Sequence, residues 1–121
     1  MIGQYERVAK DEYATLPDVI RRYLDAHDRR DSVAALAAFA ADAHVFDDGQ
    51  DYRGLDAIRD WLMKASTQFS YTRTFLDATS ERPNLWLVSN RLEGNFPGGV
   101  VDLRYLFTLV DGLIADLAIL P

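Results

Sequence analysis

Residues 22–49, RYLDAHDRRDSVAALAAFAADAHVFDDG, carry the pattern from which the fold can be predicted. Apolar residues recur at helical spacing on both sides of Asp31, so two helices are expected, with Asp31 as the cap of the second. A short strand over residues 44–47 then ends in two adjacent carboxylates, Asp47 and Asp48, and a glycine. One of these aspartates could point inward and take part in chemistry, or both could face water, as acidic turn residues often do.

The helices can be placed from their caps and apolar faces. The first is predicted to begin at TLPD, residues 15–18, with Thr15 as its cap. Its apolar face is expected to consist of Leu16, Ile20, Tyr23, Leu24 and His27. The second is expected to carry Val33, Leu36, Ala37 and Ala40 at helical spacing, with Phe39 beside them. A third helix should begin near Gly54 and place Leu55, Ile58, Leu62 and Ala65 on one face, with Trp61 adjoining. Residues 1–14 are expected to form an N-terminal arm or a short helix.

From Phe69 onward, β-branched and aromatic residues dominate and turn signals recur. Four strands are predicted, near residues 69–78, 85–95, 100–110 and 113–120. Their short connections indicate antiparallel pairing. Helices followed by hairpin-linked strands indicate an α+β domain, with the helices packed on one face of a strongly curved sheet.

Alternate residues of a strand share a face, so inward positions can be predicted. In the strand at 100–110 the core face is expected to be Val101, Leu103, Tyr105, Phe107 and Leu109. In the strand at 85–95 it is expected to be Trp86, Val88, Asn90 and Leu92. In the last strand the apolar set is Leu113, Ala115, Leu117 and Ile119. Tyr105 and Asn90 are therefore polar groups that should project toward the interior.

The same rule allows only one of Asp47 and Asp48 to point inward. Asp47 shares a face with Val45, whereas Asp48 shares one with Phe46 and His44. Parity alone leaves both assignments open.

Composition excludes several classes of function. The 121 residues include no cysteine, so disulfides, thiolate nucleophiles and cysteine zinc sites are excluded. A formal net charge of −6 argues against nucleic acid or an anionic membrane as a partner. The longest apolar run, residues 33–41, is too short to span a bilayer, and the N-terminus does not resemble a signal peptide. A cytoplasmic protein with a single domain, residues 1–121, is therefore expected.

The stretch 22–49, the following YRGLDAI, and the later GNFPGGVVDLRYLFTLVDGLI together resemble the nuclear transport factor 2-like superfamily, in its SnoaL-like and ketosteroid-isomerase-like branch. The resemblance extends from about Leu16 to near the C-terminus. It implies a cone-shaped α+β barrel, with three N-terminal helices on a curved, mostly antiparallel sheet. This fold hosts isomerases, cyclases, dehydratases, epoxide hydrolases and non-catalytic binders, so it implies no single activity.

In steroid-isomerase-like members, a first-helix tyrosine donates to the substrate oxyanion and a strand-end aspartate transfers the proton. The resemblance places Tyr23 and Asp47 at those positions without a gap, which favours Asp47 over Asp48. The second oxyanion donor of the family, an aspartic acid kept protonated, is replaced by Tyr105. A tyrosine can also donate, but its bulk would shorten the cavity and argues against steroid-type substrates.

Two other site types find less support. Arg91, Glu93 and Asp116 superficially match the epoxide-hydrolase branch, but strand parity places them on the outer face, where salt bridges at a homodimer interface are expected. His27 and His44 lie on different elements without metal-ligand spacing, so no metal site is expected.

Two functions remain open from the sequence. The first is a cofactor-independent isomerase or cyclase, with Asp47 as general base, Tyr23 and Tyr105 as oxyanion donors, and a small, largely apolar carbonyl substrate. Its substrate-binding residues are expected to be Phe46, Trp61, Trp86 and Asn90. The second is a non-catalytic ligand-binding or assembly module. The pKa of Asp47 discriminates between them, because a buried base should have a raised pKa whereas a solvated turn residue should not.

Overall fold

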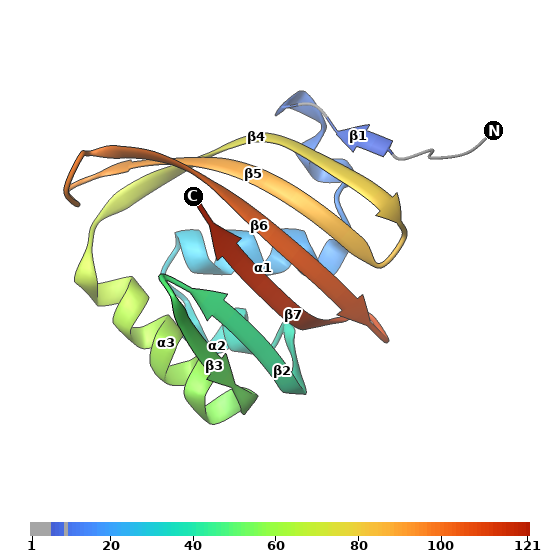
Figure 1. The fold of residues 1–121 in the computed structure, drawn as a ribbon, viewed down its shortest axis with the longest axis horizontal. Coiled ribbons are helices and arrows are strands. Elements are labelled where there is room, and N and C mark those ends of the chain that lie inside the picture. Colours follow the sequence, from blue (N-terminus) through green and yellow to red (C-terminus); the bar gives the residue numbers. More distant parts are fainter. Residues whose placement is uncertain (1–5, 9) are drawn as a thin grey trace.

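A seven-stranded mixed sheet with helices packed against one face makes up the computed structural model, which describes residues 6–8 and 10–121 (Figure 1). The strands are β1 (Glu6–Val8), β2 (Phe39–Asp47), β3 (Gln50–Arg53), β4 (Tyr71–Arg82), β5 (Leu85–Gly94), β6 (Val100–Val110) and β7 (Leu113–Leu120). Their order in the sheet is β1-β4-β5-β6-β7-β2-β3. Only β2 and β7 pair in parallel, and the other neighbours are antiparallel.

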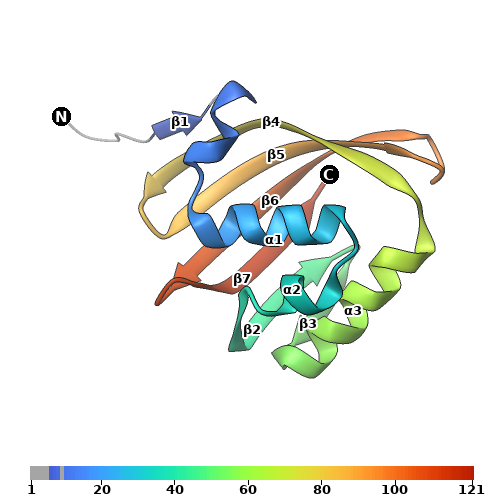
Figure 2. The same cartoon turned by 180° about the vertical axis from the view of Figure 1, so that it is seen from behind.

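The helices are η1 (Lys10–Thr15), α1 (Asp18–Asp28), α2 (Ser32–Leu36) and α3 (Gly54–Gln68). Helices α1, α2 and α3 lie on the same side of the sheet. In Figure 1, α1 lies behind β6 and β7, and α2 and α3 lie behind β2 and β3; in Figure 2 the helices are in front. The predicted α+β class, with three helices on a mostly antiparallel sheet, is confirmed. The expected arm or short helix at residues 1–14 corresponds to β1 and η1, and residues 1–5 and 9 lie outside the described chain.

Helix α1 begins two residues later than predicted. Pro17, not Thr15, occupies the cap position, and its carbonyl accepts the backbone N–H groups of Ile20 and Arg21 at 3.1 Å. Thr15 instead ends η1. The predicted apolar face is otherwise correct, because Ile20, Tyr23 and Leu24 are all fully buried, as is the preceding Leu16.

Helix α2 is capped as predicted but is shorter than predicted. The backbone N–H of Ala34 donates to Asp31 Oδ1 at 3.0 Å. The helix ends at Leu36 because the following backbone pairs with β7, where Ile114 N–H donates to the Ala38 carbonyl at 2.9 Å. Phe39 therefore starts a strand, and Val33, predicted on the buried face, is 80% exposed.

The stretch after Asp47 is a hairpin whose second strand was not predicted from the sequence. Asp48 and Gly49 both have positive φ, 52° and 74°, and Asp47 pairs with Gln50 across them. A two-residue Asp-Gly connection of this kind matches the twist of two antiparallel strands. Asp48 is thus an exposed turn residue, and β3 is an additional strand.

A bulge in β7 changes which of its residues face the core. Leu109 pairs with Ile114 and Thr108 with Asp116, so one extra residue is accommodated between them. Ile114, predicted on the outer face, is fully buried, and the predicted inward positions Leu113 and Ala115 are only partly buried. Beyond the bulge the predicted core residues Leu117 and Ile119 are buried.

The helices of the described chain are all short. The longest, α3, has 15 residues, and none of the helices within residues 6–8 and 10–121 is long and apolar enough to cross a membrane.

Candidate active site

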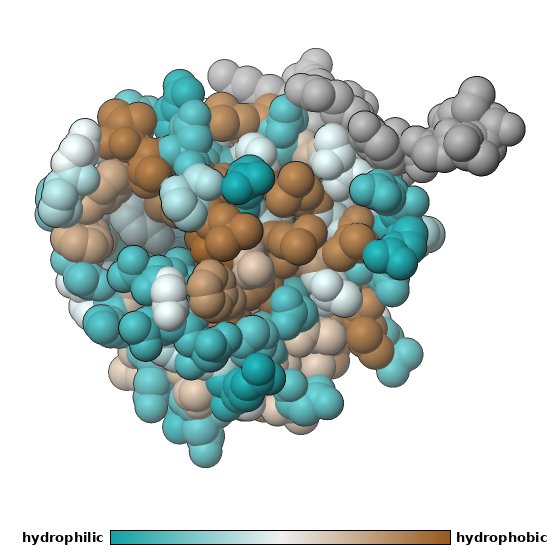
Figure 3. Space-filling view, in the orientation of Figure 1, coloured by the Kyte–Doolittle hydropathy of each residue, from teal (hydrophilic) through white to brown (hydrophobic). Residues whose placement is uncertain are grey.

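A cavity of about 400 Å³ opens at one end of the sheet. Its walls come from the ends of β2, β5 and β7, the beginnings of β4 and β6, and the inner sides of α1 and α3. In Figure 3 the molecule is hollowed on the left, between α3 and the β5–β6 hairpin. The cavity residues Gln68 and Phe96 belong to these two segments. The rest of the inner face is packed core.

Asp47 is the partly buried carboxylate of this cavity, which the exposed Asp28 and Asp48 also line. It is the last residue of β2 and shares its face with the fully buried Val45. The indole N–H of Trp61 on α3 donates to Asp47 Oδ2 at 3.0 Å. Burial raises the pKa of Asp47 above its ordinary value, while the Trp61 hydrogen bond acts in the opposite direction. A hydrogen bond from the backbone of Asp48 also lowers the pKa, so the carboxylate is oriented by both Trp61 and its own turn.

Two tyrosine hydroxyls share the cavity with Asp47. Tyr23 on α1 and Tyr105 on β6 both line it and are 1% and 7% exposed. Burial raises the pKa of both phenols well above the ordinary value, and the nearby Asp47 raises them further. Both groups are therefore neutral donors at pH 7. Neither hydroxyl forms a hydrogen bond with another described residue, so both can donate to a ligand.

The predicted substrate-binding residues divide into two groups. Trp61 lines the cavity, whereas Phe46, Trp86 and Asn90 do not. Phe46 follows the alternation of β2 to the outer face, opposite Asp47. Trp86 lies on the inner face but at the far end of β5, in the core, where its indole N–H donates to the Pro83 carbonyl at 3.1 Å.

Asn90 lies inward as predicted but is completely covered. Its Oδ1 accepts a hydrogen bond from Arg73 Nη1 at 2.9 Å. Its Nδ2 is the one buried side-chain nitrogen or oxygen in the described chain without a hydrogen-bond partner. Asn90 therefore supports the cavity wall through Arg73 and does not face the cavity itself.

A second pair of polar side chains, His27 and Tyr71, lies in the cavity and was not predicted there from the sequence. The Tyr71 hydroxyl lies 3.3 Å from His27 Nδ1, and both side chains line the cavity. Burial lowers the pKa of His27, so its imidazole is neutral at pH 7, and burial raises the pKa of Tyr71 to about 12. Helical spacing did place His27 one turn after Tyr23, on the same face of the helix. The inward position of Tyr71 depends on its pairing with Gly94 of β5, which the sequence does not reveal.

A buried arginine was also missed. Arg73 on β4 has a side chain only 8% exposed and holds Asp28, at the end of α1, with Nε–Oδ1 and Nη2–Oδ2 distances of 2.9 and 2.7 Å. Its Nη2 also donates to the Tyr13 hydroxyl at 3.2 Å. This network links β4, β5, α1 and the segment before α1 at the rim of the cavity.

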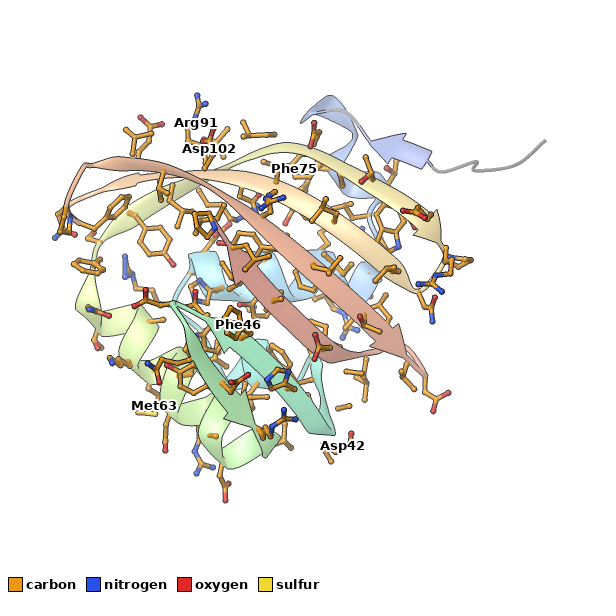
Figure 4. All side chains as sticks on the ribbon, viewed as in Figure 1. Asp42, Phe46, Met63, Phe75, Arg91 and Asp102 are labelled. Atoms are coloured by element: carbon orange, nitrogen blue, oxygen red, sulfur yellow. The ribbon has the colours of Figure 1, made fainter. Side chains whose placement is uncertain are left out.

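The residues of the epoxide-hydrolase alternative lie elsewhere. Arg91 pairs with Asp102 on the outer face, at Nε–Oδ1 2.7 Å, and the two side chains point toward each other above β5 and β6 (Figure 4). Asp116 instead forms a hydrogen bond with His44, with its Oδ1 2.8 Å from His44 Nδ1. Asp51 Oδ1 lies 2.6 Å from His44 Nε2. These hydrogen bonds raise the pKa of His44. Within the described residues, no group of three or more His, Cys, Asp or Glu side chains has the arrangement of a metal site.

The cavity thus combines one carboxylate of raised pKa, three tyrosine hydroxyls and a neutral histidine within aromatic walls. A carboxylate can accept a proton from a carbon acid or from water, and neutral phenols can stabilise a developing oxyanion by donating to it.

Comparisons with known proteins agree with this architecture. A family model described as the SnoaL-like domain matches residues 20–117. A protein of Sinorhizobium meliloti, named as a putative polyketide cyclase, is 38% identical with a TM-score of 0.83, over 88% of this chain and 97% of that chain.

More distant structures share the fold alone. A Catenulispora acidiphila protein with a ketosteroid isomerase-like fold, in complex with trimethylamine, is 18% identical with a TM-score of 0.78, over 88% of this chain and 87% of that one. A Mycobacterium tuberculosis protein in complex with estradiol-17β-hemisuccinate is 18% identical with a TM-score of 0.71, over 84% of this chain and 88% of that one. Among curated proteins, none matches this chain.

Proposed function

The chain belongs to the SnoaL-like domain family, and from this premise we propose that its 400 Å³ cavity binds a small, largely apolar molecule that carries a carbonyl group. The aromatic walls favour an apolar body, and the few polar groups converge where an oxygen could be received. Relatives of the same fold that bind a steroid derivative and trimethylamine support a binding role for this cavity.

We further propose that the domain is an isomerase- or cyclase-type enzyme that works by general-base catalysis. Asp47 removes a proton from the carbon next to the carbonyl group. The electron pair of that C–H bond forms the C=C bond of an enolate, and the π pair of the carbonyl group moves onto its oxygen. Tyr23 and Tyr105 donate hydrogen bonds to the oxyanion that develops there. In an isomerase, Asp47 then returns the proton to a different carbon. In a cyclase, the enolate carbon forms a bond to a second carbonyl carbon within the same molecule, and Asp47 gives its proton to the alkoxide that forms there. These steps require no cofactor.

The observation that carries this proposal is the environment of Asp47. The Trp61 indole holds one carboxylate oxygen at 3.0 Å in a partly desolvated cavity, and burial raises the pKa of the carboxyl group. A general base is most effective when its pKa is moved toward the working pH while it stays ionised. The exposed Asp48, one residue later, lies in the turn after the strand.

The proposal can be tested without knowledge of the natural substrate, because a general base should catalyse exchange of α-hydrogens in a bound ketone. We expect the protein in deuterated buffer to exchange the methyl hydrogens of 2-acetylnaphthalene, followed by NMR. Asp47→Asn preserves shape and should reduce exchange at least 100-fold while leaving the dissociation constant nearly unchanged. Tyr23→Phe should slow exchange less, because Tyr105 can still donate.

Asp48→Asn provides the matched control and should exchange like the wild type. Full exchange activity in Asp47→Asn would refute the base assignment. Binding without exchange in the wild type would favour the alternative function, a ligand-binding module of the same fold.

We also propose that two copies associate into a two-fold homodimer through the outer face of the sheet. An apolar row of cross-strand neighbours runs over this face, formed by Leu87, Leu106, Ala118 and Phe46. Brown apolar surface gathers over β6 and β7 in Figure 3. A self-complementary face of this kind is the usual basis of a two-fold dimer.

A further inference from the structure

A second cavity, of about 240 Å³, adjoins the first. It lies between the C-terminal end of α1 and the junction of α3 with β4, which are close together in both Figure 1 and Figure 2. Asp28, Ala65, Tyr71 and Arg73 line both cavities. These four side chains form the common wall of the two cavities, so a ligand that occupies both must pass beside them.

The second cavity carries one uncompensated positive charge. Arg73 is neutralised by its two hydrogen bonds to Asp28. Arg30 also lines this cavity, and it has no carboxylate partner among residues 6–8 and 10–121. Arg30 is exposed, and its Nη1 donates to the Ser66 carbonyl at 3.0 Å, which holds the guanidinium near the cavity wall and leaves its other N–H groups open to solvent or to a ligand. An unpaired guanidinium is notable in a chain with a net charge of −6.

The backbone of Arg30 adds an independent observation. Arg30 follows α1 with φ of 58°, in the left-handed region where helix ends usually place glycine. Its N–H donates to the His27 carbonyl at 3.0 Å, so this conformation closes the helix. A glycine would serve that turn with less strain, whereas the arginine side chain places a charge at the cavity.

We propose that the second cavity binds a carboxylate group of the ligand, with Arg30 as its main partner, while the apolar body of the same ligand occupies the first cavity. This inference rests on the proposed function, because it adds an acidic end to the carbonyl compound received by Tyr23 and Tyr105. A monoanion fits the single net charge of the cavity. A phosphate dianion would leave a charge uncompensated beside Asp28.

The test compares two probes that differ only by the acid group, 2-acetylnaphthalene and 6-acetyl-2-naphthoic acid, by isothermal titration calorimetry. We expect the wild type to bind the acid about tenfold more tightly than the parent ketone, as for a charge-assisted hydrogen bond at a partly solvated site. Arg30→Gln should remove this preference, and Arg30→Lys should retain part of it. Arg29→Gln is the matched control, because Arg29 is the neighbouring arginine and pairs with Asp31 at 3.7 Å.

The outcomes separate this inference from the proposed function. Loss of the preference in Arg30→Gln alone supports the carboxylate site. The carboxylate site is overturned if the wild type binds both probes equally. It is also overturned if Arg29→Gln and Arg30→Gln lose the preference to the same extent. In both cases the proposed general-base function remains supported if the ketone still exchanges its α-hydrogens. If neither probe binds, both the inference and the proposed substrate class fall.

Discussion

The carboxyl group of Asp47 is harder to ionise in the folded chain than in the unfolded chain, because burial raises its pKa. The charged form therefore lowers the stability of the fold at neutral pH. We expect Asp47→Asn to raise the melting temperature at pH 7. The gain should be complete above the folded pKa, shrink as the pH falls through it, and vanish below the unfolded value of about 3.9. Thermal unfolding of both proteins at pH 4 and pH 7 measures this, and a lower melting temperature for the variant at pH 7 would contradict it.

The indole of Trp61 should set the pH at which Asp47 becomes active. Its hydrogen bond stabilises the carboxylate and so lowers the pKa of Asp47. Trp61→Phe removes the donor and should move the acidic limb of the exchange rate to higher pH by about one unit. Trp86→Phe is the control, because that indole donates to the Pro83 carbonyl and does not line the cavity. An unchanged profile in Trp61→Phe would show that the hydrogen bond does not control the base.

For single residues, the sequence predicted the inward position of Asp47 and Tyr23. It gave no indication that Arg30 and Tyr71 line a cavity. Strand parity left Asp47 and Asp48 both open, and the family resemblance favoured Asp47, which does face the cavity. Phe46 was assigned to the same site although it is adjacent to Asp47 on the strand, and adjacent residues face opposite sides. Arg30 shows no periodicity or motif, because its role depends on a cavity formed by residues far apart in sequence.

Among the elements, α1 is joined to the sheet through Arg73, which contacts Asp28 on α1 and Asn90 on β5. We expect Arg73→Met to lower the free energy of unfolding by about 3 kcal/mol, because it leaves Asp28 unpaired and the buried amide of Asn90 without any partner. Adding Asn90→Val should recover part of this loss by removing the unsatisfied amide. Urea denaturation of the single and double variants measures the difference.

Arg91→Met is the control for that experiment, since Arg91 and Asp102 form their ion pair on the exposed outer face and should contribute little. A double variant that is less stable than Arg73→Met would show that Asn90 stabilises the fold by itself and not through the arginine.

The predicted elements were most accurate where one strong periodicity determined them. The strands at 85–94, 100–110 and 113–120 lie close to their predicted limits, because alternating side chains and Asp-Gly or Pro-Gly turns mark them. The errors occur where tertiary pairing overrides local preference. The alanine-rich end of α2 is locally compatible with a helix, yet pairing with β7 extends β2 back to Phe39. The bulge in β7 is set by its two partner strands and has no signature in its own sequence.

Across the whole molecule, one sheet face holds both a packed core and a cavity. Phe107, Ile114 and Val88 are fully buried toward one end of the strands, and Tyr105, Tyr71 and Asp47 face the cavity at the other end. Parity identifies which residues share this face but not how far along each strand the helices cover it. For this reason Trp86 and Asn90 were placed at the site by their face alone.

The opposite face of the sheet leads to the prediction at the largest scale, a two-fold homodimer. The row Leu87, Leu106, Ala118 and Phe46 is only half-buried in a single chain, although these residues adjoin across four strands. Pairing with the same row of a second copy would remove this apolar surface from water. Light scattering at micromolar concentration should therefore give a mass near twice 13.7 kDa.

The substitution that tests this interface is Leu106→Glu, at the centre of the row. A carboxylate there would face its own symmetry-related copy, so we expect dissociation to a monomer of 13.7 kDa with the fold preserved by circular dichroism. Val33→Glu is the control, because Val33 is equally apolar and 80% exposed but lies on α2, on the helical side of the sheet. It should leave the mass unchanged. A wild type that is monomeric at micromolar concentration would refute the dimer, and dissociation by Val33→Glu instead of Leu106→Glu would place the interface on the helical side.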